Sequence, residues 1–127
     1  MTWERFTERG LYKIAPLITV NSDGSLRLNR PFVELGGLKF QRRYALLYDQ
    51  EEGAVAFVRN RAGFSFHPAS GEAGLFQCRK LIRSFVGTST PWSHIRLPMR
   101  FPYRAFGYQG DPVPGFSLSE GVEEQTV

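Results

Sequence analysis

Cysteine is almost absent from this sequence. The single residue, Cys78, cannot form a disulfide within the chain, and a lone thiol is typical of a reducing compartment. The sequence also lacks a run of the about 18 to 20 apolar residues that a membrane-spanning helix needs. Its charged N-terminus has no apolar signal-peptide core. We therefore expect a cytoplasmic protein without a membrane partner.

Motifs for catalysis and for metal or cofactor binding are equally scarce. His67 and His94 are far apart in the sequence, and neither they nor Cys78 have the spacing of zinc ligands. The glycine-rich pieces lack the P-loop Lys-Ser/Thr and the context of a dinucleotide fingerprint. Cys78 lies among apolar residues at helical spacing, where a thiol is buried and inert. The sequence predicts no enzyme, no cofactor and no metal; the alternative is a nucleophilic Cys78–His94 pair with Asp49 or Asp111.

Arginine dominates the positive charge. Thirteen of the sixteen cationic side chains are Arg, and the net charge is +4. Residues 26–43 carry five cations and one acid, residues 59–104 eight cations and one acid, and residues 105–127 four acids and no base. Arg binds phosphates and carboxylates with a planar fork, whereas Lys mainly maintains solubility. This distribution favours an anionic partner; the alternative is an Arg-rich composition without a binding role.

The stretch from residue 17 to residue 59 has the clearest secondary-structure pattern. Apolar and polar residues alternate on both sides of a tight turn that ends at Gly24, which can take a positive φ. The same pattern returns around a turn over residues 49–53. The sequence therefore predicts two β-hairpins, with strands over 18–20, 26–28, 44–48 and 54–58.

A short helix is expected between these hairpins. Asn29 can cap it, and Pro31 falls in the first turn, where the missing N–H costs nothing. Gly36-Gly37 can end it in a left-handed conformation. Its expected apolar side consists of Phe32, Leu35 and Leu38.

This order of elements resembles one chain of an AbrB/MazE/SpoVT swapped-hairpin DNA-binding domain. The segment ITV…DGSLRLNRPFVELGGL matches the strand, glycine turn, strand, Pro-started helix and Gly-Leu of that family, and ALLYDQEEGAVAFV matches its second hairpin. The resemblance covers residues 17–59. It implies an intertwined homodimer whose basic loop residues face DNA. The arginines at such positions are Arg27, Arg30, Arg42 and Arg43.

A second helix is expected over residues 76–87, after a loop over 67–74. Its apolar stripe consists of Cys78, Leu81, Ile82, Phe85 and Val86. Its opposite side consists of Arg79, Lys80 and Arg83. A helix that reads a groove normally adds Asn, Gln, Ser or Thr for base edges, and only Gln77 and Ser84 are available here, so phosphate contact is favoured over sequence recognition.

Residues 96–104 alternate between apolar residues and Arg or Pro. Proline cannot donate to a sheet ladder, so we expect an edge strand or a polyproline-like extension. Its arginines would lie about 13 Å apart and meet roughly every second phosphate of a nucleic acid. The arginines are Arg96, Arg100 and Arg104, and the nearby rings that could stack on bases are Trp92, Phe101 and Tyr103. The alternative is that Arg and Pro only protect a sheet edge.

The sequence thus predicts an α+β, mostly β, protein. Two β-hairpins around a short helix are followed by a second helix and an Arg/Pro-rich edge strand. We expect an N-terminal arm over 1–13, a single globular domain over 14–106 and an acidic flexible tail over 107–127.

The predicted function is that of a homodimeric nucleic-acid-binding protein, such as a transcriptional regulator, that contacts DNA or RNA phosphates. The alternative is a non-enzymatic accessory or inhibitor protein that binds an acidic surface of a larger protein. The predicted contact residues are Arg27, Arg30, Arg42, Arg43, Arg79, Arg83, Arg96, Arg100 and Arg104.

Overall fold

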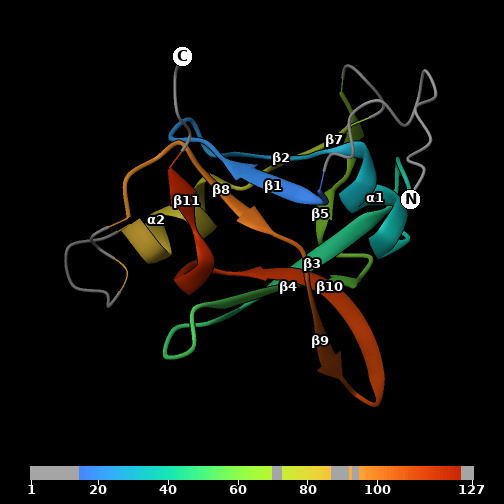
Figure 1. Cartoon of the computed structure of the whole chain (residues 1–127). Coiled ribbons are helices and arrows are strands. Elements are labelled where there is room, and N and C mark those ends of the chain that lie inside the picture. Colours follow the sequence, from blue (N-terminus) through green and yellow to red (C-terminus); the bar gives the residue numbers. More distant parts are fainter. Residues whose placement is uncertain (1–14, 70–72, 87–91, 93–94, 124–127) are drawn as a thin grey trace, which may run out of the picture.

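The computed structural model describes residues 15–69, 73–86, 92 and 95–123 of the chain. These residues form two antiparallel β-sheets and two α-helices, which confirms the predicted mostly β, α+β class. The N-terminal arm expected over 1–13 lies outside the described residues. Figure 1 shows one sheet above the other, with α1 (Arg30–Gly36) and α2 (Arg79–Val86) at opposite sides of the molecule.

The first sheet has the strand order β11-β8-β1-β2-β7-β6, and the second has the order β5-β3-β4-β10-β9. The strands of the first sheet are β1 (Leu17–Val20), β2 (Ser25–Leu28), β6 (His67–Pro68), β7 (Gly74–Gln77), β8 (Met99–Pro102) and β11 (Val122–Glu123). Those of the second are β3 (Arg43–Asp49), β4 (Ala54–Arg59), β5 (Phe64–Ser65), β9 (Arg104–Tyr108) and β10 (Asp111–Ser117). A 3-10 turn over Leu118–Glu120 leads from β10 to β11.

Aromatic rings join the two sheets in one core. Phe57 of the second sheet stacks on Phe76 of the first, with ring centroids 5.3 Å apart and planes at 5°. Phe116 of the second sheet lies 5.1 Å from Phe101 of the first, with the ring planes tilted by 37°. All four side chains are at most 1% exposed. Each large ring buries a large apolar area, so these pairs contribute strongly to the hydrophobic stabilisation of the core.

The two halves of the chain use the same order of elements. β1, β2, α1, β3 and β4 of the first half correspond to β6, β7, α2, β9 and β10 of the second, which has the additional strand β8 between α2 and β9. Corresponding strands pair with each other, β2 with β7 and β4 with β10. In addition, β8 pairs with β1, and β3 pairs with β5, which directly precedes β6. The fold therefore interlocks two similar units within one chain.

Asn29 connects the first hairpin to α1. Its Oδ1 accepts hydrogen bonds from the backbone N–H groups of Phe32 and Leu17, both at 3.0 Å. Its Nδ2 donates to the carbonyl oxygen of Ala15 at 2.8 Å. Gly37, with φ of 65°, ends the helix in the left-handed conformation expected from the sequence. One side chain thus caps the helix and holds the start of β1.

We expect Asn29→Ala to lower the free energy of unfolding by about 1–2 kcal/mol, because two backbone donors lose their acceptor. Asn29→Asp is the matched control: its carboxylate can still accept both hydrogen bonds, and only the donation to Ala15 is lost. Urea unfolding followed by circular dichroism measures both variants. An alanine variant as stable as the wild type would contradict this role.

The apolar side of α1 differs from the prediction. Phe32 and Leu38 are buried as expected, but Leu35 is 60% exposed, and Val33 is buried in its place. The helix ends at Gly36, so Leu38 follows the left-handed residue and no longer obeys helical spacing. Helical periodicity therefore assigned one residue to the wrong face.

The second helix begins later than predicted, at Arg79. Residues 74–77 form β7 instead, and Phe76 lies opposite Leu26 of β2. This pairing places Phe76 in the core, and tertiary burial outweighs the helical spacing of the local sequence. Within the expected stripe, Cys78, Leu81 and Ile82 are buried.

The prediction of a flexible tail over 107–127 is wrong for residues 107–123. β10 pairs with β4 and β9, and Phe116 and Leu118 are buried. A Cβ at Gly115 would lie 2.1 Å from the carbonyl oxygen of Val55, so this glycine permits close strand packing. The strand was not predicted because acids, glycines and prolines lie between the apolar residues of this segment. The globular unit accordingly extends beyond the predicted boundary at 106.

The predicted edge strand over 96–104 is also corrected. β8 pairs with β1 on one side and β11 on the other, so it is not an edge, and Arg104 belongs to β9 in the second sheet. Pro102 is the last residue of β8 and Pro98 lies just outside it, where a missing N–H interrupts no central ladder. The alternation itself is retained: Met99 and Phe101 are buried, and Leu97 and Tyr103 are partly buried against the same core.

Candidate arginine-lined site

Four arginines line one hollow at the end of the β3–β4 hairpin that lies away from its turn. The hollow has a volume of about 630 Å³. β3 and β4 pair so that Tyr44 lies opposite Arg59, and this register brings residues that are far apart in the sequence together. We call this group the arginine hollow; its lining residues are Gln41, Arg42, Arg43, Arg59, Asn60 and Arg61.

A tight turn over residues 60–63 shapes the hollow. The N–H of Asn60 donates to the carbonyl oxygen of Arg43 at 3.1 Å, and its Oδ1 accepts from the N–H of Ala62 at 2.8 Å. A Cβ at Gly63 would lie 2.2 Å from the carbonyl carbon of Tyr44, so only glycine allows this close approach. Arg43 Nη1 donates to the carbonyl oxygen of Gly63 at 3.2 Å. The turn and one guanidinium are therefore held against β3.

The arginine hollow carries positive charge without local compensation. The sequence has no Asp or Glu over 35–48 or over 53–71. Among the residues that the structure describes, none of the four arginines forms an ion pair. Lys39 lies exposed just before this group. Clustered charge of one sign in a concave surface concentrates anions, and guanidinium forks match the geometry of phosphate oxygens.

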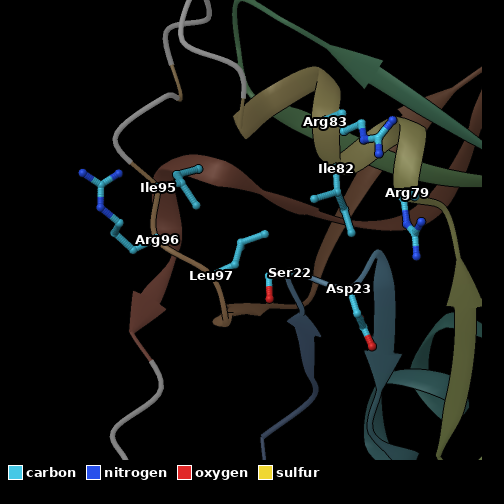
Figure 2. Close-up of a pocket in the computed structure, with 8 residues that line it drawn as sticks. All are labelled: Ser22, Asp23, Arg79, Ile82, Arg83, Ile95, Arg96 and Leu97. Carbon is cyan, nitrogen blue, oxygen red and sulfur yellow. The ribbon is translucent and has the colours of Figure 1, made fainter.

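The other predicted arginines are distributed over separate places. Arg79, Arg83 and Arg96 line a second concavity beside α2 (Figure 2). Arg27 and Arg100 flank Thr19 in one row of paired residues, on the face of the first sheet opposite its buried side chains. The structure therefore brings Arg42 and Arg43 together with Arg59 and Arg61, which were not in the predicted set. The five arginines named in this paragraph lie elsewhere.

The remaining two predicted arginines lie beside carboxylates. Arg30 Nε donates to Glu34 Oε1 at 2.8 Å on the exposed side of α1. Arg104 forms a two-pronged ion pair with Glu120, which raises the pKa of Arg104 and lowers that of Glu120 through hydrogen bonding. Arg96, Arg100 and Arg104 therefore do not form one surface as expected, and Arg104 is already paired with Glu120.

The three predicted stacking rings are not arranged as a platform. Phe101 is fully buried, so we do not retain a base-stacking role for it. The Trp92 indole donates to the carbonyl oxygen of Gln50 at 2.9 Å and packs over Gly53, where a Cβ would lie 2.4 Å from the ring. The Tyr103 ring packs edge-on against a core phenylalanine, and burial raises its pKa. These rings stabilise the fold.

Sequence reasoning missed Arg59 and Arg61 and two exposed rings next to the hollow. Phe40 and Phe64 are each 38% exposed and belong to the segments that border it. The signal that could have found the arginines is the hairpin itself, because a turn over 49–53 places residues 43 and 60 opposite each other. The number of residues in a turn sets the register of its hairpin.

Cys78 is buried and 1% exposed, and desolvation raises the pKa of its thiol to about 12. This setting is opposite to the electropositive, accessible one that activates a nucleophilic thiol. The protonated, enclosed thiol acts as a small apolar residue in the core.

We expect Cys78 to resist iodoacetamide at pH 8 in the folded protein and to react once guanidinium unfolds it. Above about pH 9 an unfolded thiol loses its proton while the buried one keeps it, so the free energy of unfolding should fall between about pH 9 and pH 12. Mass spectrometry of alkylated samples measures the first effect. Rapid labelling of the folded protein would contradict the buried state.

The described part of the chain contains no cluster of potential metal ligands and no membrane-spanning helix. No three His, Cys, Asp or Glu side chains there are placed to hold a metal ion. Neither helix described above is long and apolar enough to cross a bilayer. No protein-family model, curated protein or solved structure matches the chain. The arginine hollow is therefore the feature from which we derive a function.

Proposed function

We propose that this protein binds nucleic acid through phosphate contacts made by the arginine hollow. The observation that supports this proposal is the gathering of Arg42, Arg43, Arg59 and Arg61 around one concavity that has no acidic lining residue. Each guanidinium can donate two parallel hydrogen bonds to a phosphate. Four such groups suit a partner with several phosphates better than a single phosphate ion.

The surroundings of the hollow support contact with the nucleic-acid backbone rather than sequence reading. Apart from the arginines, only Gln41 and Asn60 among its lining residues could read base edges, and Asn60 Oδ1 already accepts a hydrogen bond within its turn. The exposed rings Phe40 and Phe64 lie in the bordering segments and could stack on unpaired bases. We expect weak sequence preference and tolerance of single strands.

Titration of labelled single-stranded and double-stranded oligonucleotides over a range of salt concentrations tests this proposal. Four phosphate contacts should release counterions, so log K against log salt should have a slope of about −3 to −4. Absence of binding at low salt, or an affinity that does not change with salt concentration, would contradict the proposal.

The resemblance of residues 17–59 to the swapped-hairpin domains supports two finer proposals, that DNA is the preferred partner and that the protein is a homodimer. Light scattering after size exclusion tests the second, since a dimer has twice the chain mass of 14.5 kDa. A measured mass equal to that of one chain would reject the homodimer, but it would not contradict the proposed phosphate contacts.

A second candidate function is binding to an acidic surface of a larger protein. Exposed Phe40 and Phe64 beside several arginines have the composition of interface hot spots, which are rich in aromatic rings and arginine. A pull-down from nuclease-treated lysate separates the two candidates. A partner that survives nuclease and is lost when the four arginines are neutralised would favour the protein partner.

A further inference from the structure

A second concavity, distinct from the arginine hollow, lies between α2 and the turn of the first hairpin (Figure 2). Its volume is about 670 Å³, and it shares no lining residue with the arginine hollow. Ligand pockets in proteins commonly measure about 300–1,000 Å³. The concavity is thus large enough to hold a small organic molecule.

Three of the eight residues that line this concavity are apolar. Ile82 of α2 and Ile95 before β8 are 4% and 3% exposed, and Leu97 is half-buried beside them. In Figure 2 these three side chains converge on the same space. Because the two isoleucines are almost fully buried, Leu97 would supply most of the hydrocarbon surface that a ligand covers.

Positive charge lies next to these apolar residues. Arg79 and Arg83 extend from α2 on one side of the space, whereas Arg96 points away from it in Figure 2. Asp23 is the only acid among the lining residues, and its Oδ1 already accepts hydrogen bonds from the Ser25 N–H at 2.9 Å and hydroxyl at 2.6 Å. The lining residues therefore carry a net positive charge, and the Asp23 carboxylate is hydrogen-bonded within the hairpin turn.

The backbone holds the two sides of the concavity in place. The N–H of Cys78 donates to the carbonyl oxygen of Gly24 at 2.9 Å. A Cβ at Gly24, whose φ is 95°, would lie 2.9 Å from the Cβ of Arg79. The turn is thus packed directly against the start of α2, and the concavity is formed before any ligand binds, as most small-molecule sites are.

We infer that this concavity binds a small molecule that has an apolar body and one acidic group. The isoleucine and leucine side chains would cover the body, and Arg79 and Arg83 would bind the carboxylate, sulfonate or phosphate. A neutral ligand would leave both guanidinium groups unused, and a nucleic acid would gain little from the apolar side chains. This inference does not depend on the proposed function.

Two fluorescent probes test the inference. 8-Anilinonaphthalene-1-sulfonate has an apolar body and one anionic group, and N-phenyl-1-naphthylamine has the same ring system without the charge. We expect the full-length wild type to bind the sulfonate about tenfold more tightly than the neutral probe, because charged hydrogen bonds add to apolar burial. Equal affinities for the two probes would overturn the inference.

Variants locate the binding. Arg79→Gln with Arg83→Gln should weaken sulfonate binding by about tenfold and leave the neutral probe within about twofold. Arg42→Gln with Arg43→Gln makes the same charge change at the arginine hollow and should alter neither affinity. The assignment would be overturned if the Arg79 and Arg83 variant bound the sulfonate as tightly as the wild type. It would also be overturned if the Arg42 and Arg43 variant lost as much sulfonate affinity as the Arg79 and Arg83 variant.

Isoleucine methyl spectra give a readout that requires no substitution. The chain has four isoleucines, of which Ile82 and Ile95 line the concavity and Ile18 is fully buried in the core. Adding the sulfonate probe to protein labelled at isoleucine methyls should shift the Ile82 and Ile95 signals and leave the Ile18 signal in place. Shifts at Ile18 with none at Ile82 would contradict the site.

Discussion

Changing Arg42, Arg43, Arg59 and Arg61 together to Gln is expected to weaken oligonucleotide binding about a thousandfold at 0.1 M salt, and to reduce the salt slope by about 3 to 4. The reason is that each guanidinium lost from the arginine hollow leaves one phosphate with its condensed counterion, so less counterion release drives association. Fluorescence anisotropy of a labelled oligonucleotide, measured at several salt concentrations, gives both quantities. Glutamine keeps hydrogen-bonding capacity and much of the side-chain length, so the change isolates charge.

A second quadruple variant controls for total charge. Arg79→Gln, Arg83→Gln, Arg96→Gln and Arg100→Gln remove the same four charges from places outside the arginine hollow. Long-range attraction alone predicts equal losses for the two variants, whereas direct contact at the hollow predicts a much smaller loss for this one. Equal losses would show that the hollow has no special role. Circular dichroism should confirm that both variants remain folded.

Replacing Phe76 by Ala is expected to lower the free energy of unfolding by about 3–5 kcal/mol. Phe76 is fully buried, stacks on Phe57, and lies 4.8 Å from the ring centroid of Phe66 and 6.0 Å from that of Tyr44. Truncation leaves a cavity where both sheets meet and removes three ring contacts. Because domains of this size are stable by about 5–15 kcal/mol, this is a large fraction of the total.

Phe64→Ala is the matched control, since it is the same substitution at a ring that is 38% exposed in β5. We expect it to cost about 1 kcal/mol or less, because little packing is lost at a partly exposed position. Urea unfolding with a common m-value measures the two variants. Similar losses for both would contradict the position of Phe76 at the centre of the core.

Local structure in the first half could be predicted because nearby residues determine it. The turn that ends at Gly24 needs a positive φ, observed at 95°, and the cap at Asn29 depends on atoms three residues away. Gly37 ends α1 for the same local reason. Each of these features is decided within one turn of the chain, where sequence patterns are most informative.

Features that depend on distant partners could not be predicted. The glycines and prolines after residue 106 indicated flexibility, yet this segment forms β9 and β10 because β4 offers an edge on which Phe116 becomes buried. Phe76 has helical spacing with later apolar residues, yet it pairs with β2. In both cases a long-range strand pairing outweighed local composition.

The amino-acid sequence alone determined the fold class, the turns and the cap of α1, and it marked arginine as the main source of positive charge. Only the tertiary structure decided which arginines share a surface: Arg42 and Arg43 meet Arg59 and Arg61 across a hairpin, while Arg104 pairs with Glu120. The physical reason is that composition records how many charges a chain carries, whereas strand register and packing determine the distances between them, and electrostatic attraction depends on distance.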